Sequence, residues 1–588
     1  MKKIYGFAAL CAAMTLASCS NNDEPIVPVD GSTTATVAGY LSVNIANSSK
    51  GTRADFQYGS PEESRAKTAT FVFFDADGNY VTMSPNQELT STNAPGSSAP
   101  NVERDYNVMV PVGVLVDGDV DNKAVAAATI AATIDRVVVI LNPTATINTA
   151  VTNQSEPKVL EIAADYSALT ADNEFVMTNS VYMDGDSNFV YGQDVNGKIY
   201  SSQLEATQNA VDLYVERVVA RVDVKEAEEG FKITAPEISI YDYDTNHKMV
   251  ETKNTYNMVV TGIEVANIAN QSYLVKNLDE SFKTAGRFDG WNDAANFRSH
   301  WATAWSFDTT LDADRTLAEA DQKDITKTYF RNQSYNTFNN GSYPSNNSLS
   351  ASFYVNENTN ATNKTALVVS CEIQDADGNG VTFYRTEKDG RYYSEEGVTN
   401  VLLDMLKREG YYVATAFNEE NEPTALRNLE ASDLDFVSAV KAGVDNATGY
   451  QGYLAFKDAE NAGKMYQTRD GGVSFEKVDN FVSNVLHSQA YTVWKWNEGK
   501  CYFYVELTND EDDANGEGKI AGIIRNHIYE VSLTSMMGFG IPVFDPTDVI
   551  VPETPDKLTP EDEWSLACNI HILSWVRYQQ EGNFSTDY

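Results

Sequence analysis

The sequence has few histidines, few cysteines and few basic residues for its length. Its 588 residues include 5 His and 5 Cys, and 43 Lys and Arg stand against 84 Asp and Glu, for a formal net charge of −41. Proteins bind nucleic acid and anionic membrane surfaces through Lys and Arg, so this balance disfavours both kinds of partner. The scarcity of His and Cys leaves little material for a metal or thiol enzyme. Hydrophobic residues make up 42% of the chain, which is enough for a large core.

Catalytic motifs are also lacking, as is any run of about 18 apolar residues that could span a membrane after Leu16. There is no His-Glu-x-x-His, no Walker loop and no Gly-x-Ser-x-Gly elbow. Carboxylates are so frequent that a pair for glycoside hydrolysis could be chosen anywhere, which leaves a glycosidase as a weak alternative. We therefore predict a protein that is not an enzyme and uses no cofactor or metal. The histidines show no metal-ligand spacing: His247, His300, His487, His527 and His571.

Residues 1–19 have the pattern of a secretory signal. Lys2 and Lys3 precede an apolar run over residues 6–16 that is too short to cross a bilayer. Two small residues then precede Cys19, which looks like the bacterial lipobox, where the peptide is cut before the cysteine and the thiol takes a diacylglycerol. The alternative is an ordinary signal peptide with an incidental cysteine. Acyl chains on Cys19 would hold the precursor on a membrane.

The remaining cysteines do not indicate a disulfide framework. Cys371, Cys501 and Cys568 are an odd number for an exported chain. We expect small buried thiols, of which two could form one pair.

Most of the chain has the alternation of β-strands. In residues 36–46, Val37, Leu41, Val43 and Ile45 fall on one face at a period of two. Helical patterns are few, at residues 124–133 and 397–408. Further strands are predicted at 70–74, 80–83, 137–141, 212–224, 238–243, 256–268, 368–373, 381–384, 500–507 and 528–533.

An Asp-Ala-Asp-Gly-Asn sequence occurs twice, at residues 75–79 and 375–379, each time between two predicted strands. It is similar to a calcium loop, but an EF-hand needs its Gly at position six, and here the Gly comes fourth. We favour hairpin turns in which Gly or Asn takes a positive φ.

Two biased segments separate the strands near the C-terminus. Residues 332–364 are rich in Asn, which predicts a surface loop or a poorly ordered insert. Residues 542–563 hold five Pro and predict a semi-rigid spacer. The alternating strand that follows is not stable alone, so it must pair with its own domain or with another chain.

Trp291, Trp301 and Trp305 lie close together in the sequence with Phe297 and Phe307. They could form a carbohydrate platform, and a local aromatic core under a loop is the favoured alternative.

Several segments, taken together, resemble the Bacteroidales type V fimbrillins, most closely the minor-fimbrium major-subunit branch. Ser20 to Glu24 is also similar to the surface-export signal of Bacteroidetes lipoproteins, although it could be a plain polar tether. The segments are 40–45 with 51–54, Val-Glu-Arg-x-x-Ala-Arg at 215–221, Tyr-x-x-Glu-Asn-Thr at 354–359, Arg-Asn-x-x-Tyr at 525–529 with Gly538 and Gly540, and the strand at 570–575.

The resemblance implies a lipoprotein precursor at the outer membrane and cell surface that is cut by an Arg-specific protease between Arg53 and Ala54. The cut would remove the strand over 36–46 and open an apolar groove. A C-terminal strand of another subunit would fill this groove and build a fimbria that supports adhesion. Its partners would be further copies of the chain, tip and anchor subunits and the protease. The donor residues would be Leu566, Cys568, Ile570, Ile572 and Trp575.

The residues around Arg53 support the first step independently. Arg53 lies in a polar, Gly-containing stretch that is suited to nicking. Arg65, which has acidic neighbours and lies next to the strand over 70–74, and Lys50, which does not match the family's Arg, stay as alternatives.

We therefore expect a mostly-β fold of two transthyretin-like, Greek-key β-sandwich domains with a C-terminal donor strand. A monomeric glycan-binding surface lipoprotein is the alternative function. The expected segments are a signal at 1–19, a propeptide at 20–53, domains at 54–225 and 226–541, a spacer at 542–563 and a tail at 564–588.

Overall fold

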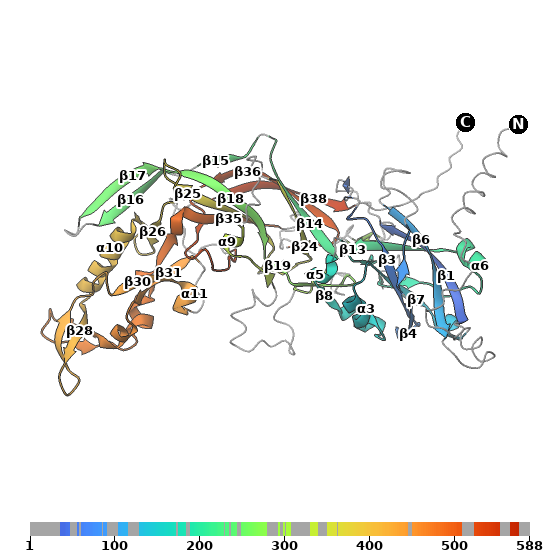
Figure 1. The fold of residues 1–588 in the computed structure, drawn as a ribbon, viewed down its shortest axis with the longest axis horizontal. Helices are drawn as coiled ribbons and strands as arrows, with labels where there is room; N and C mark the ends of the chain where they lie inside the picture. Colours follow the sequence, from blue (N-terminus) through green and yellow to red (C-terminus); the bar gives the residue numbers. More distant parts are fainter. Residues whose placement is uncertain are drawn as a thin grey trace, which may run out of the picture.

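The computed structural model shows an elongated, mostly-β molecule, which confirms the predicted fold class (Figure 1). A large sheet from the N-terminal part of the chain lies at one end, and helix α10 with strand β28 lies at the other. The structure describes residues 36–47, 56–57, 60, 62–84, 86–90, 104–115, 129–171, 174–183, 188–228, 230–234, 237–243, 248–278, 292–293, 298–299, 302–306, 330–338, 350–360, 363–444, 450–507, 522–552 and 565–575.

The N-terminal part forms a nine-stranded sheet in the order β4-β3-β7-β9-β13-β1-β6, with β5 and β12 beside it. The inward-facing residues Phe71, Val139 and Leu213 form a core on one face. On the other face, Val72 and Ile140 pack against short helices. Because both faces of the sheet are covered, the central strands β3 and β7 are mostly apolar along their length and do not alternate with polar residues. The strands are β1 (Thr36–Asn47), β3 (Thr68–Phe74), β4 (Tyr80–Met83), β5 (Gln87–Glu88), β6 (Arg104–Leu115), β7 (Arg136–Leu141), β9 (Met177–Asn179), β12 (Gln193–Asp194) and β13 (Val211–Arg217).

Short helices and small strand pairs surround this sheet. Thr144 and Ser202 cap α3 and α6 by accepting a backbone hydrogen bond with their hydroxyls. The helices are α3 (Ala145–Val151), α4 (Glu156–Glu161), α5 (Tyr166–Leu169) and α6 (Gln203–Gln208). The strand pairs are β10 (Tyr182–Met183) with β11 (Phe189–Val190), β8 (Ala163–Asp165) with β20 (Gln271–Tyr273), β19 (Ile268–Ala269) with β23 (Phe330–Arg331), and β21 (Asn292–Asp293) with β22 (Arg298–Ser299).

Two further sheets form a β-sandwich with a shared core in the middle of the molecule. A six-stranded sheet has the order β2-β38-β36-β14-β24, with β15 beside β36, and a four-stranded sheet has the order β18-β25-β35-β37. Val222, Tyr529 and Val531 of the first sheet pack with Val369 and Phe503 of the second. The strands are β2 (Phe56–Gln57), β14 (Val219–Glu226), β15 (Lys232–Thr234), β24 (Ala351–Asn356), β36 (His527–Met537), β38 (Ser565–Trp575), β18 (Asn257–Ala266), β25 (Ala366–Gln374), β35 (Lys500–Glu506) and β37 (Ile541–Pro542).

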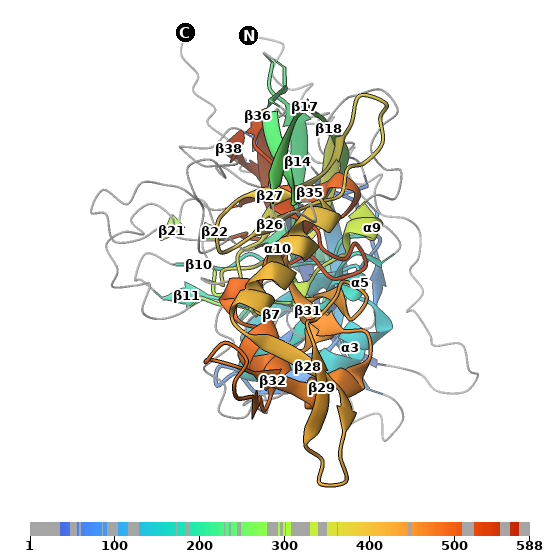
Figure 2. The ribbon, with the colours of Figure 1, turned by 90° about the vertical axis from the view of Figure 1, so that its left-hand side faces the viewer.

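Helix α10 (Glu395–Arg408) covers the far end, where Figure 2 shows it in front of the remaining sheets. Ser394 caps its N-terminus by accepting from the Gly397 backbone N–H at 3.0 Å, and Leu402 and Leu406 are buried. The predicted helix over 397–408 is therefore confirmed.

Two sheets at this end carry the surrounding strands. The seven-stranded sheet is β17 (Met249–Thr255), β16 (Glu237–Tyr243), β27 (Tyr392–Tyr393), β26 (Phe383–Thr386), β34 (Val493–Trp496), β31 (Gln451–Phe456) and β30 (Leu434–Ser438). The four-stranded sheet is β29 (Pro423–Arg427), β28 (Tyr411–Phe417), β32 (Met465–Gln467) and β33 (Glu476–Lys477). Short helical segments are α9 (Tyr335–Phe338), α11 (Ala439–Ala442), η5 (Ala459–Lys464), η6 (Val482–Leu486), η7 (Gln489–Tyr491) and η8 (Asn497–Gly499).

The two Asp-Ala-Asp-Gly-Asn segments form turns, as predicted. In each, the first Asp side chain accepts hydrogen bonds from the backbone N–H groups two and four residues later, at 2.8–2.9 Å. Gly78 and Gly378 adopt φ values of 79° and 84°, which L-residues rarely adopt. The carboxylate oxygens of Asp75 and Asp375 thus accept hydrogen bonds from the backbone of their own turns.

Three predicted elements differ from the structure. The single strand over 212–224 is two strands in two sheets, with a break at Val218, whose N–H bonds to the Val176 carbonyl at 3.0 Å. By contrast, the predicted helix over 124–133 is helical at residues 129–133, and residues 124–128 lie outside the described part.

The other two differences are in the two biased segments. The Asn-rich segment is not simply a surface loop, because Tyr335 and Phe338 are buried and residues 351–356 form β24. Its Asn358 is fully buried and bonded to Asn267 and Thr365. The first half of the supposed Pro-rich spacer is also packed, because Val543, Phe544 and Ile550 are buried. Apolar residues between the prolines explain this packing.

Candidate functional site

Strand β1, which carries the predicted removable residues, lies inside the nine-stranded sheet. It pairs in parallel with β13, where Val43 lies opposite Val211, and antiparallel with β6, where Leu41 lies opposite Val110. The side chains of Leu41 and Val43 are fully buried. Removal of β1 would therefore leave an apolar gap between two strands whose hydrogen-bonding edges would both be unpaired.

The backbone positions of Val37 and Ile45 also fall in β1, opposite Val114 of β6 and Leu213 of β13. Cys19, Arg53 and Ala54 lie outside the described residues. The alternative Arg65 is described and lies between Ser64 and Ala66, which are both buried.

The predicted donor strand is β38, and it pairs within its own chain. Leu566 lies opposite Met536, Ile570 opposite Val531 and Ile572 opposite Tyr529, all on β36. Cys568 lies opposite Leu533, and Trp575 pairs with Gln57 of β2. β38 therefore belongs to the six-stranded sheet, whereas β1 belongs to the nine-stranded sheet (Figure 1).

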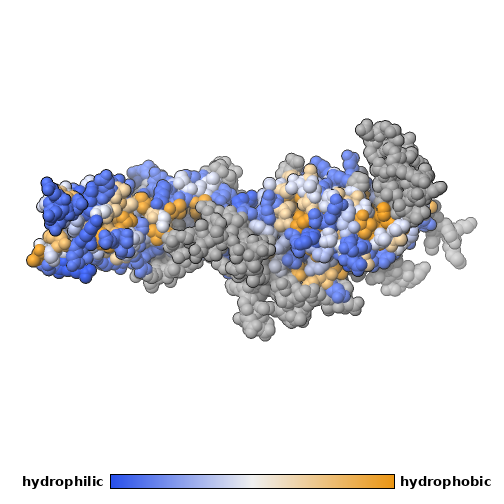
Figure 3. Space-filling view, turned by 90° about the horizontal axis from the view of Figure 1, so that it is seen from below, coloured by the Kyte–Doolittle hydropathy of each residue, from blue (hydrophilic) through white to orange (hydrophobic). Residues whose placement is uncertain are grey.

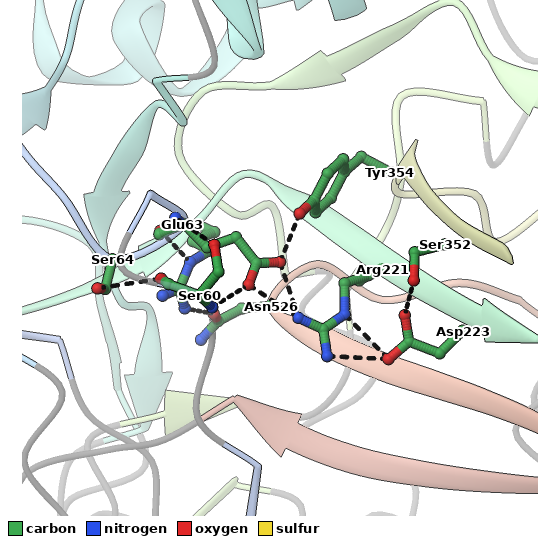
Figure 4. A network of polar contacts seen from close by, with 9 residues as sticks. Ser60, Glu63, Ser64, Arg221, Asp223, Ser352, Tyr354 and Asn526 are labelled. Atoms are coloured by element: carbon green, nitrogen blue, oxygen red, sulfur yellow. Dashed lines mark hydrogen bonds and ion pairs between the residues drawn. The ribbon is translucent and has the colours of Figure 1, made fainter. Parts of the chain in front are cut away.

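A buried polar network joins these two sheets, and Figure 4 shows its residues. Both carboxylate oxygens of Glu63 accept from Arg221 Nη1 at 2.8 Å, and one also accepts from the Tyr354 hydroxyl at 2.7 Å. The backbone carbonyl of Glu63 accepts from Arg217 Nε at 2.7 Å, and Arg217 also reaches Asn526. Burial raises the pKa of Glu63, but the bonds and charge of Arg221 outweigh it, so the pKa lies below its ordinary value.

Further buried ion pairs lie in the same region. Lys276 Nζ lies 2.9 Å from Glu216 Oε2, and both side chains are at most 1% exposed. Arg525 bonds Glu357 at 2.9 Å and the carbonyl of Leu274 at 2.9 Å. A buried charge is costly unless it is paired, so these contacts hold the segments in one arrangement.

Sequence reasoning missed this network, although its members stand in the motifs that carry the family resemblance. Glu216, Arg217 and Arg221 belong to one motif, Glu357 to the second and Arg525 to the third. The available signal was a charged residue inside an otherwise apolar strand. Such a residue is rarely left unpaired when it is buried.

Cys371 and Cys501 are buried free thiols, as expected. Cys371 and Cys501 lie opposite each other on β25 and β35, and burial raises the pKa of each thiol. Of the possible aromatic platform, only Trp305 lies among the described residues, and it is half-buried. Within the described ranges there is no group of three or more His, Cys, Asp or Glu that could hold a metal ion. No helix in the described part of the chain is long and apolar enough to cross a membrane.

Comparisons with known proteins give one family match. Residues 494–581 match the family described as major fimbrial subunit protein type IV, fimbrillin, C-terminal. This range includes β35, β36, β37 and β38. A comparison with curated proteins gave no match.

Solved structures similar to this chain include two from different bacteria. One is a candidate cell adhesion protein from Parabacteroides distasonis, at 11% identity and a TM-score of 0.36, covering 92% of this chain and 99% of that one. Another is the tip fimbrial protein Mfa3 from Porphyromonas gingivalis, at 11% identity and a TM-score of 0.29, covering 91% of this chain and 99% of that one. The match to the fimbrillin family is therefore confined to residues 494–581, the C-terminal part of this chain.

Proposed function

We propose that this chain is a structural subunit of a cell-surface fimbria that supports adhesion and assembles by donor-strand exchange. The precursor would be a lipoprotein acylated on Cys19 and cut between Arg53 and Ala54 by an Arg-specific protease. The cut would release β1, and β38 of another subunit would take its place. The fimbrillin match supports the structural role, and the position of β1 is the observation that carries the exchange step.

Strand β1 has the properties of a strand that can be replaced. It is paired on both sides, so the gap that it would leave offers backbone partners along two strands. Leu41 and Val43 contribute fully buried apolar side chains, and each such side chain is worth about 1.5–3 kcal/mol. An empty gap is therefore unstable, and an alternating strand from another chain would fill it.

Strand β38 is a suitable replacement. It has 11 residues against 12 in β1, and four of its alternate positions are apolar. It lies in a different sheet from β1, so a contact between one subunit's tail and the next subunit's gap is heterologous. A heterologous contact of this kind can propagate as a filament.

The burial around Arg65 supports the proposal of Arg53 as the site of processing. A protease nicks exposed chain most readily, and the residues on both sides of Arg65 are buried. The domain boundary near residue 225 stays a prediction, because the chain already passes from β13 in one sheet to β14 in the other at Val218.

The test compares the precursor with an Arg53→Ala variant. Treatment of the purified precursor with an Arg-specific protease should give a chain that begins at Ala54 and a ladder of oligomers on a gel. Arg53→Ala should give neither, whereas the matched control Arg469→Ala, at an exposed arginine, should behave like the wild type. A ladder from the Arg53→Ala precursor would contradict the proposal.

A further inference from the structure

The turn that follows the proposed cleavage site is held by segments from across the sequence. We call Ser60 with residues 62–66 the Glu63 turn. Within it, the Ser64 N–H bonds the Ser60 carbonyl at 3.2 Å, and the Ser60 hydroxyl accepts from the Glu63 N–H at 3.3 Å. The Glu63 side chain also accepts from the Ser60 N–H. The turn is thus held by hydrogen bonds among its own residues, in addition to its contacts with other parts of the chain.

Outside the turn, Glu63 is bonded to three distant residues. Arg221 and Tyr354 donate to its carboxylate, and Arg217 donates to its carbonyl. The Glu63 side chain is 1% exposed, although its neighbour Glu62 is exposed to solvent. These contacts hold the turn against β14 and β24 of the six-stranded sheet (Figure 4) and against β13 of the nine-stranded sheet.

The peptide bond after Arg65 is held on both sides. The carbonyl of Arg65 accepts from Asn142 Nδ2 at 2.9 Å, and the N–H of Ala66 donates to the Tyr106 hydroxyl at 2.7 Å. A protease must draw several residues around the cleaved bond into its own cleft, so this bond is accessible only after the turn has opened.

We infer that the Glu63 turn is a processing stop, which withholds Arg65 from the Arg-specific protease and keeps the N-terminus of the mature subunit upstream of Ser60. This inference rests on the proposed function, because a stop is needed only if such a protease acts on the neighbouring Arg53. A cut after Arg65 would remove Glu63 with the leader. Arg221 and Tyr354 would then lose their buried acceptor, and the junction between the two sheets would lose one of its contacts.

Glu63 is therefore a specificity-determining residue for processing, and it acts through the conformation of the turn. Its test measures which bond is cut. The full chain is treated with an Arg-specific protease, and the rates of cleavage after Arg53 and after Arg65 are measured by intact mass and N-terminal sequencing. The wild type should be cut after Arg53 and stay intact at Arg65.

Glu63→Gln should raise the cleavage rate at Arg65 about 100-fold, because cleavage follows the population of the open turn. Tyr106→Phe removes only the hydroxyl, which accepts from the Ala66 N–H and donates to the Ser64 carbonyl, and it should raise the same rate about 10-fold. The matched control is Glu62→Gln, which removes the same charge near Arg65 from an exposed side chain. It should leave the rate at Arg65 unchanged.

The outcomes separate this inference from the proposed function. Cleavage of the wild type after Arg65 as fast as after Arg53 overturns the stop. Equal effects of Glu62→Gln and Glu63→Gln on the cleavage rate at Arg65 also overturn it. Such a result would mean that negative charge near Arg65, and not the conformation of the turn, protects this bond. If the wild type resists cleavage at Arg53 while Glu63→Gln and Tyr106→Phe expose Arg65, the stop is supported and the proposed function fails. Tyr106→Phe keeps the ring in place, so the test does not depend on the folding of Glu63→Gln.

Discussion

Glu63 keeps a negative charge inside the protein because donors surround its carboxylate. Its contact with Arg221 joins residues 158 positions apart in the sequence. Local periodicity reports only on neighbouring residues, so no sequence pattern could pair these two. The motif around Arg221 was visible as a family resemblance, and its role as an ion-pair partner became visible only in the folded chain.

The depressed pKa of Glu63 predicts a pH-dependent contribution to stability. Because the pKa in the folded state lies below the ordinary value of 4.5, the contribution is fully present above that value and is lost as the pH falls through the folded-state pKa. At pH 7, Glu63→Gln should lower the free energy of unfolding by about 3 kcal/mol, the low end for a broken buried pair, because Arg221 retains Asp223.

Denaturant titrations of both proteins from pH 7 to pH 3 check this expectation. The difference in unfolding free energy should be constant down to about pH 5 and then shrink. Glu62→Gln should show a difference near zero throughout, because that side chain is exposed. A difference between wild type and Glu63→Gln that grows on acidification would contradict the pKa assignment.

At the scale of elements, strands with strong alternation or continuous apolar runs were predictable, and their partners were not. The strands over 137–141, 238–243 and 528–533 lie within β7, β16 and β36. The break at Val218 was not predictable, because residues 212–224 keep their strand pattern while the chain passes between sheets. The Asn and Pro content wrongly predicted a loop and a spacer in the described parts of 332–364 and 542–563, respectively. Apolar residues between the Asn and Pro residues, such as Phe338 and Val543, pack into the core.

The pairing of β38 with β36 adds a requirement to the proposed exchange. A strand that is docked in its own subunit must leave β36 before it can enter another subunit. A disulfide between Glu530→Cys and His571→Cys, which lie opposite each other on these strands, should therefore abolish the oligomer ladder while cleavage at Arg53 continues. The variants carry Cys568→Ala, which removes the thiol on the same strand.

A reductant should restore the ladder, since it releases β38 and leaves the free thiols of Cys371 and Cys501 unchanged. The matched control is a disulfide between Ser239→Cys and Lys253→Cys on β16 and β17, strands that the exchange does not separate. This control protein should polymerise whether its engineered disulfide is oxidised or reduced. Polymerisation of the oxidised 530/571 protein would show that β38 need not leave β36.

At the scale of the whole molecule, acidity and an elongated shape determine how subunits meet. Residues 1–53 contain four basic and three acidic residues, so their removal changes the net charge only from −41 to −42. In the proposed processing, the acidity would therefore stay with the mature subunit. Hydrophilic residues cover much of the face in Figure 3, among separate hydrophobic areas. Subunits with this charge repel one another, so in the proposed assembly the inserted apolar strand would have to supply the attraction.

This repulsion predicts that assembly is faster at higher ionic strength. The Debye length falls from about 10 Å at 0.1 M salt to about 3 Å at 1 M, which screens charges on approaching subunits but leaves strand insertion in place. We expect the rate of ladder growth to rise severalfold between 0.05 and about 0.5 M NaCl after cleavage is complete. Sucrose at matched osmolality strengthens burial without screening charge, and it should have a smaller effect. A rate that falls with salt would indicate that attractive ion pairs between subunits drive assembly, because only attraction between opposite charges is weakened by screening.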